Sequence, residues 1–325
     1  MSLRDLPLES GDVIADFTIS FAVHGDLEDR AKPVVIVLCA IGSTHHRLDF
    51  LIGPGQALDP ARHRILAIDA IGNGLTTSPS NAPSRSGMEF PKFTIADMVR
   101  SQKLLLETLG ITDKVAVVGA SMGGMQALQW AVTYPDTVSR VVALTPMAKT
   151  AAWSGAINHA ARQSLFAKLG EHPRKGVYPP DVWNAWTPIM QMLAMRTPAQ
   201  VDTEFGSPAE VQAWLVHRAS WWREQHFDPI DWIYQSWAYD AHDVGAGARF
   251  GGDTAAALAS ITAKTMIVAA TLDLYNPVSC AREAARHISG AEFHTLQSSW
   301  GHLMATPADN HAVKWLNAKI RNFLA

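Results

Sequence analysis

Hydrophobic positions along the chain alternate between short β-branched runs and longer segments with helical periodicity. The short apolar runs predict strands, at residues 33–38, 64–68, 114–118, 138–144, 265–270 and 292–296, with an N-terminal strand or hairpin arm at 13–23. The helical pattern and its capping signals predict helices at 94–109, 122–134, 279–287 and 309–323. This alternation predicts an α/β protein whose mostly parallel central sheet is flanked by helices.

Residues 151–245 depart from this rhythm, because their apolar positions have helical spacing and form no convincing strand. They hold eight of the eleven tryptophans, namely Trp153, Trp183, Trp186, Trp214, Trp221, Trp222, Trp232 and Trp237. We predict a helical cap over the ligand-binding edge of the sheet, inserted into a core domain of residues 1–150 and 246–325. The alternative is an ordinary packed subdomain with a tryptophan core. Both descriptions hold if some aromatic side chains line the pocket and others face a dimer partner.

Composition and charge limit the classes of partner that we expect for the protein. The 325 residues are 48% hydrophobic, with a formal net charge of -3 and a pI near 6.5. Such a balance gives no electrostatic footprint for nucleic acid or an anionic membrane, so neither is expected as a partner. The first residues, MSLRDLPLES, show no apolar run behind a basic start, and we expect cytoplasmic residence. Cys39 and Cys280 form no metal or disulfide pattern, and Cys39 ends a buried strand, where packing is the expected role.

The strongest chemical signal is the segment VAVVGASMGGM at residues 115–125. It places Ser121 between Gly119 and Gly123, at the junction of an expected strand and an expected helix. Glycines at these positions let strand and helix pack closely, and the turn exposes the serine hydroxyl at the helix N-terminus. The pattern is typical of the nucleophile elbow of α/β-hydrolases. The alternative is a glycine-rich turn whose serine only caps the helix.

A nucleophilic serine needs a base and a group that orients the base. In α/β-hydrolases these follow in the order serine, acid, histidine. Asp273 comes directly after the expected strand at 265–270, and His302 lies between the last expected strand and the last helix. We therefore predict that His302 takes the Ser121 proton while Asp273 holds the imidazole, although Asp273 could be only a turn former. Surface or structural roles are expected for the competing histidines, His287, His294 and His311.

An oxyanion hole requires two backbone N–H groups. We expect one from Met122, the residue after the nucleophile, and the other from Ile41 in the loop at residues 39–43. His45 and His46 follow this loop and could border the acyl pocket. With His63 they lack the spacing of a metal site, so no metal is expected. The turn Gly72-Asn73-Gly74 is not part of a dinucleotide fingerprint.

Several longer segments carry a more specific resemblance. They are IGPG (52–55), DAIGNGLTTSPSN (69–81), FPKFTIADMVRSQKLLLETLGI (90–111), VVGASMGGMQALQWAVTYPD (117–136) and HFDPIDWIYQSWAYDAHDVG (226–245), together with Asn158 and Arg162-Gln163. With these segments the chain resembles the homoserine O-acetyltransferase family of α/β-hydrolase-fold enzymes. The resemblance implies a catalytic triad of Ser121, Asp273 and His302. It also implies an acyl-serine intermediate, acyl-CoA as a co-substrate with no other cofactor, and a homodimer associated through the cap.

The chain departs from the family where the acceptor is bound. The family's catalytic histidine is usually followed by an aspartate that helps to hold the amino group of homoserine, whereas Leu303 follows His302 here. Pro188 stands at the place of the family's carboxylate-binding arginine, which leaves Arg162 or Arg196 as candidates for that role. Because burying an unpaired charged group costs several kcal/mol, these changes disfavour specific homoserine binding.

Three functions remain open on these grounds. The first, which we favour, is a serine hydrolase of small carboxylic esters that acts through an acyl-enzyme. The second is an O-acyltransferase that moves an acetyl or other acyl group from acyl-CoA to an alcohol. The third is a non-catalytic scaffold that binds a ligand or partner. In the first two, the partner is a small-molecule ester or acyl donor.

Overall fold

The computed structural model describes residues 1–170, 173–225 and 227–325. Glu171, His172 and His226, which belong to the expected cap, lie outside the described residues, and His226 also begins one of the family-like segments. The described part contains a seven-stranded sheet of order β3-β5-β4-β6-β7-β8-β9, in which only β3 is antiparallel to its neighbour. Its strands are β3 (Phe21–His24), β4 (Val34–Leu38), β5 (Arg64–Ile68), β6 (Val115–Ala120), β7 (Val138–Leu144), β8 (Lys264–Ala270) and β9 (Glu292–Leu296).

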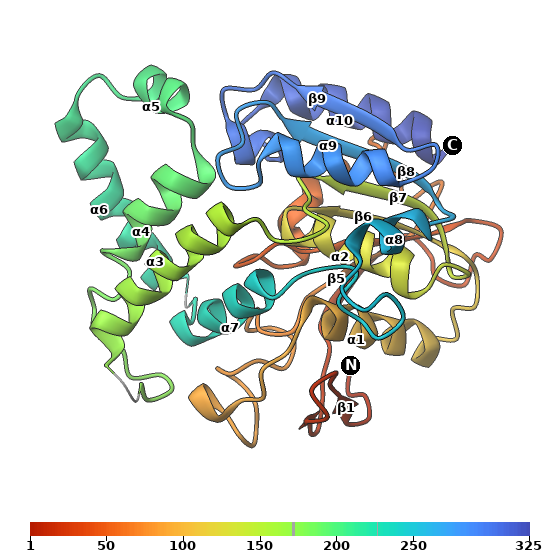
Figure 1. The fold of residues 1–325 in the computed structure, drawn as a ribbon, viewed down its shortest axis with the longest axis horizontal. Helices are drawn as coiled ribbons and strands as arrows, with labels where there is room; N and C mark the ends of the chain where they lie inside the picture. The colour runs from red at the N-terminus through yellow and green to blue at the C-terminus, as the bar shows by residue number, and fades with distance from the viewer. Residues whose placement is uncertain (171–172, 226) are drawn as a thin grey trace.

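The two faces of the sheet are covered by different helices (Figure 1). Alternate residues of each strand point to opposite faces, so Ile36 of β4 belongs to one apolar cluster and Val37 to the other. The first cluster includes α1 (Ile95–Thr108), α2 (Met122–Thr133), α8 (Thr254–Ala259) and α9 (Val278–His287). The second includes η1 (His45–Leu51) and α10 (Asn310–Leu324). Strands buried on both sides explain the continuous apolar runs in the sequence.

The helical insertion lies to one side of the sheet, at the left of Figure 1. An isolated β-bridge between Lys149 and Asp243 joins the two chain segments at its base. Between these residues the described chain forms helices and loops and no strand. The elements are α3 (Ala152–Leu169), α4 (Trp186–Pro188), η3 (Ile189–Met195), α5 (Pro198–Glu204), α6 (Pro208–Glu224) and α7 (Pro229–Asp240). We call the region between the bridge residues the cap.

The N-terminal region differs from the expected single strand or hairpin arm at residues 13–23. Its first part, β2 (Val13–Ile14), pairs with β1 (Leu6–Pro7) in a separate small sheet, and β3 begins only at Phe21. Asp16 adopts a φ of 50°, which breaks the extended backbone between them. The expectation was therefore wrong in joining two strands that belong to different sheets.

Most other expected elements agree with the structure to within two residues at each end. The sequence did not predict η1, α8 and the short 3-10 turns η2 (Gly87–Glu89) and η4 (Gly301–Ala305). Within the described residues, no helix combines the length and apolar character needed to cross a bilayer.

Candidate active site

Ser121 sits at a strained turn between β6 and α2. Its φ of 58° and ψ of -123° are unusual for a residue with a side chain, and helix α2 begins at the next residue, Met122. The backbone is held on both sides, because Ser121 N–H donates to Leu144 O at 2.8 Å and Met125 N–H donates to Ser121 O at 3.0 Å. The neighbouring strand and the first turn of α2 together fix the direction of the serine hydroxyl.

The glycines around Ser121 are required by close backbone contacts. A Cβ added at Gly119 would lie 2.1 Å from Gly123 O, and one added at Gly123 would lie 2.4 Å from Leu38 O. Both distances are far below van der Waals contact, and the obstructing atoms are backbone. Helix α2 can therefore approach β4 and β6 only if these positions lack side chains.

Three side chains from separate loops meet above this turn. His302 Nε2 lies 2.8 Å from Ser121 Oγ, and His302 Nδ1 lies 2.8 Å from Asp273 Oδ2. All three residues are buried. An ionised carboxylate can only accept a hydrogen bond, so the imidazole proton belongs on Nδ1, which leaves Nε2 free to accept the Ser121 proton. The arrangement has the connectivity of a nucleophile, a general base and an orienting acid.

The carboxylate of Asp273 is oriented by its own turn after β8. The backbone N–H groups of Tyr275 and Asn276 each donate to Asp273 Oδ1 at 2.8 Å, so Oδ2 remains for His302. Asn276 Nδ2 in turn donates to Thr145 O at 2.7 Å, which ties this turn to the end of β7. The ring of Tyr275 packs edge-on against the His302 imidazole, with centroids 5.1 Å apart.

Residues 40–43 of the loop after β4 line the cavity around Ser121. Ala40 N–H donates to Ser43 Oγ at 2.8 Å, and Gly42 N–H donates to Gln235 Oε1 at 2.9 Å. Among the described residues, no protein acceptor takes the N–H of Ile41 or that of Met122, the first residue of α2. These two amides therefore have no protein partner there, and their role as oxyanion donors stays a prediction.

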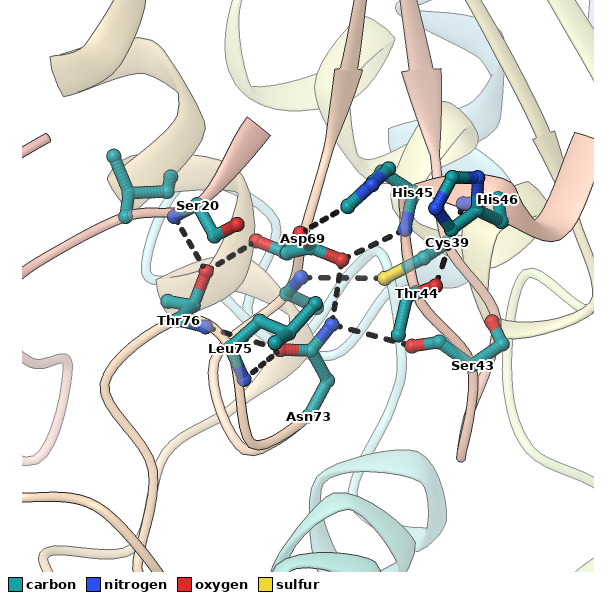
Figure 2. A network of polar contacts seen from close by, with 12 residues as sticks. Ser20, Cys39, Ser43, Thr44, His45, His46, Asp69, Asn73, Leu75 and Thr76 are labelled. Atoms are coloured by element: carbon teal, nitrogen blue, oxygen red, sulfur yellow. Dashed lines mark hydrogen bonds and ion pairs between the residues drawn. The ribbon is translucent and has the colours of Figure 1, made fainter. Parts of the chain in front are cut away.

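A partly buried polar network anchors this loop (Figure 2). The carboxylate of Asp69, at the end of β5, accepts from His45 N–H and from Asn73 Nδ2, each at 2.7 Å. His45 Nδ1 lies 2.7 Å from the other Asp69 oxygen, and Asn73 Nδ2 also donates to Ser43 O at 3.2 Å. The network holds both ends of the segment from Ser43 to His45 and thereby the loop that carries Ile41.

The histidines that follow this loop have structural partners. His45 is engaged by Asp69, and the exposed His46 pairs with Asp49 at 2.7 Å, so neither lines the cavity around Ser121. In the part of the chain that is described, no group of three His, Cys, Asp or Glu side chains is placed to hold a metal ion. Cys39 is fully buried, and burial raises the pKa of its thiol, which agrees with the expected packing role.

Ser121 and His302 open into a cavity of about 230 Å³ between core and cap. Leu303, the residue expected to replace an acceptor-binding aspartate, lines it and adds apolar surface. Seven further lining residues come from the cap, and all of these except Arg218 are aromatic or sulfur-containing. The aromatic and sulfur-containing residues are Trp186, Met190, Met195, Trp222, Phe227 and Trp232.

Two arginines bring positive charge to this cavity. Burial lowers the pKa of Arg47 to about 10, and its Nη1 donates to Ala305 O at 2.5 Å. Arg218 of α6 lies over the Trp221 ring, 3.8 Å from its centroid. Among the described residues, no carboxylate lies within ion-pair distance of either guanidinium. The cavity therefore favours negative charge that develops on a bound molecule.

Arg162 was expected to bind substrate, but its side chain does not line the cavity around Ser121. Its Nη2 pairs with Asp240 at 2.6 Å and its Nη1 donates to Ser236 Oγ at 3.1 Å, both within the cap. Asp240 accepts from Asn158 Nδ2, and Asn158 accepts from the Tyr275 hydroxyl. The Arg162 side chain thus supports the turn of Asp273 from a distance. The alternative candidate, Arg196, bonds to Gln191 and lies 3.9 Å from Glu204, also outside the lining.

Comparisons with known proteins identify a family model, a relative and solved structures that are similar to this chain. A sequence model of the alpha/beta hydrolase fold family matches residues 32–305. A homoserine O-acetyltransferase of Thermobifida fusca is 32% identical, over 91% of this chain and 86% of the relative. The structure of an acetylester hydrolase from Corynebacterium glutamicum is similar with a TM-score of 0.89 and 26% identity, over 99% of this chain and 94% of that chain. The structure of the acetyl esterase MekB is similar with a TM-score of 0.89 and 28% identity, over 100% of this chain and 95% of that chain.

The glycine contacts yield a stability prediction. Gly123→Ala places a methyl group against Leu38 O and should cost about 1–3 kcal/mol of unfolding free energy, with loss of the serine geometry. Gly247→Ala is the matched control, because nothing lies within 4 Å of a Cβ there. Thermal unfolding of both variants measures the difference. Equal midpoints for the two variants would contradict the packing argument.

Proposed function

This chain belongs to the alpha/beta hydrolase fold family, and from that premise we propose that it is a serine hydrolase of small carboxylic esters that acts through an acyl-enzyme. The carrying observation is the continuous contact from Ser121 Oγ through His302 to Asp273, with both heavy-atom distances at 2.8 Å. A non-catalytic scaffold needs no such connection. The likeness to an acetylester hydrolase and an acetyl esterase supports the same class of reaction.

In the proposed reaction, His302 Nε2 takes the Ser121 proton as Oγ attacks the ester carbonyl carbon. The carbonyl oxygen becomes negatively charged and accepts from the N–H groups of Ile41 and Met122. When the tetrahedral intermediate collapses, the carbon–oxygen bond to the alcohol breaks and His302 gives its proton to the departing oxygen. Water, deprotonated by the same imidazole, then attacks the acyl-serine and releases the carboxylic acid and the free serine.

The cavity supports a small acyl group. A volume of about 230 Å³ must hold the reacting ester and is bounded by bulky side chains such as Trp186 and Trp232. Both indoles are nearly fully buried and pack edge-on against each other, with centroids 5.2 Å apart. A long acyl chain would have to displace these packed aromatic side chains. Displacing them costs far more free energy than displacing a flexible loop.

The second candidate is an O-acyltransferase that uses acyl-CoA, favoured by the identity to a homoserine O-acetyltransferase. The lining argues against homoserine itself as the acceptor. Leu303 offers no charge to an ammonium group, and Arg162 is engaged by Asp240 within the cap. Because a zwitterion needs partners for both charges when it is buried, water is the better-supported acceptor.

We also propose that two copies associate through their caps, as the family resemblance implies. The cap exposes apolar side chains, with Val216 of α6 at 69% and Val177 at 70% of their maximal exposure. Light scattering should give the mass of two chains, and Val216→Asp should shift it toward one. Val13→Asp, at an exposed position outside the cap, is the control. A single-chain mass for the unmodified protein would overturn this proposal.

Replacing the nucleophile tests the hydrolase directly. Ser121→Ala should abolish release of p-nitrophenol from p-nitrophenyl acetate, a fall of at least about 10⁴-fold in kcat, because no other group can form the acyl-enzyme. A fluorophosphonate should label the unmodified protein at Ser121 and leave the variant unlabelled. A protein that neither cleaves short esters nor reacts with the probe would be the scaffold instead.

Competition between water and alcohols separates the two enzymatic candidates. The hydrolase proposal predicts that thiol release from acetyl-CoA is slow and is not accelerated by added homoserine or simple alcohols. The check is a thiol assay with and without each acceptor, beside p-nitrophenyl acetate hydrolysis by the same sample. An acceptor that accelerates thiol release and is itself acetylated would favour the transferase.

A further inference from the structure

One cap side chain reaches into the loops that form the core side of the site. Gln235, on α7, is fully buried. Its Oε1 accepts from Gly42 N–H at 2.9 Å and its Nε2 donates to Ile71 O at 3.1 Å. One amide therefore links the cap to two separate core loops, the one after β4 and the one after β5.

Glycines in both loops leave room for the side chains that pack around this amide. A Cβ at Gly72 would lie 2.7 Å from Phe93 Cζ and 3.0 Å from Gln235 Cγ, and Gly72 adopts a φ of +82°. Gly42 has a φ of +61°, and a Cβ there would lie 2.9 Å from a ring carbon of Phe227. Glycine at both positions permits the positive φ and the close approach of the cap.

The hydrogen bond to Gln235 also determines which backbone N–H group of the loop after β4 is free. Gly42 N–H is occupied by Gln235, whereas the N–H of the preceding residue, Ile41, has no protein acceptor among the described residues, and Ile41 itself lines the cavity. The amide of Gln235 has a single orientation that satisfies both neighbours, because a carbonyl oxygen must accept the N–H while an NH₂ group must donate to Ile71 O. Gln235 therefore sets the position of the peptide beside the proposed oxyanion donor.

We propose that Gln235 is a positioning residue for the oxyanion hole, so that the cap contributes to the chemical step as well as covering the substrate. The inference rests on the proposed hydrolase function. Oxyanion donors act through a preset geometry, and a loop released from α7 would hold Ile41 N–H less accurately where charge develops in the transition state. The substrate's ground state, which carries no oxyanion, would be affected much less.

The test uses Gln235→Met, which keeps the length of the side chain and removes both hydrogen bonds. With p-nitrophenyl acetate, kcat should fall about 10- to 100-fold while KM changes less than about 3-fold, because one oxyanion donor is misplaced but not removed. Affinity for a trifluoromethyl ketone, whose adduct with Ser121 carries an oxyanion, should fall by the same factor as kcat/KM. Parallel losses would locate the defect in stabilisation of the oxyanion, and a control variant separates this from general loosening of the cap.

Tyr234→Phe is the matched control. The Tyr234 hydroxyl, on the same helix, donates to Met88 O at 3.0 Å and Phe90 O at 2.7 Å, so it also ties the cap to the core but away from the oxyanion loop. This variant should lower thermal stability and leave kcat within about 3-fold of the unmodified value, because the oxyanion geometry is kept. An equal fall of kcat in both variants would show that general loosening of the cap is responsible, and would overturn the proposal.

Gln235→Glu provides a second variant in case the methionine variant does not fold. When ionised, its carboxylate can accept from Gly42 N–H but cannot donate to Ile71 O; when protonated, the carboxyl group can do both. The proposal expects kcat of Gln235→Glu to lie between the values of Gln235→Met and the unmodified protein. If Gln235→Met does not fold, kcat of Gln235→Glu should lie within about 10-fold of the unmodified value. Unchanged kcat in Gln235→Met overturns the role of Gln235. Absence of activity and of fluorophosphonate labelling in the unmodified protein instead refutes the hydrolase function.

Discussion

The site depends on how closely helix α2 approaches the sheet at Gly119 and Gly123. A side chain at either position would collide with backbone oxygen atoms. The close approach forces Ser121 into a positive φ and starts α2 at the next residue, so one turn delivers both the hydroxyl and the free N–H of Met122. The strain is held by Leu144 O on one side and by the first turn of α2 on the other.

The cap is bonded to the site in several places and is more than a cover. Ser154 Oγ donates to Tyr275 O at 2.5 Å, and the Tyr239 hydroxyl donates to Asn276 Oδ1, so the turn that carries Asp273 is held from the cap. Gln235 makes the corresponding contact with the loop that carries Ile41. Hydrogen bonds from one insertion thus reach the loops of both the acid and the proposed oxyanion donor. Access of substrate must leave these bonds intact or break them reversibly.

The sequence allowed prediction of those parts of the site that local patterns and chain order determine. The glycines around Ser121, and the places of Asp273 and His302 after β8 and β9, follow from strand ends and motif spacing. It did not find Gln235, whose partners lie more than 150 residues away. A glutamine within a helical segment carries no signal of its own. Arg162 was misplaced because a charged residue in a helix shows neither its direction nor its partner, Asp240.

The same limit applies to Arg47 and Arg218, whose presence at the cavity depends on how η1 and α6 pack. At the N-terminus, an apolar pattern could not reveal that Val13 and Phe21 belong to different sheets. Cytoplasmic residence and dimerisation through the cap stay predictions, since neither follows from the packing of one chain.

The most direct measurement is the mass of the protein quenched during turnover of p-nitrophenyl acetate, followed by peptide mapping. The account predicts a transient species that carries one acetyl group, located on the peptide and side chain of Ser121, which disappears when the ester is consumed. Steady hydrolysis with no acetylated protein, or with the acetyl group on another residue, would contradict the proposed relay from Asp273 through His302 to the serine.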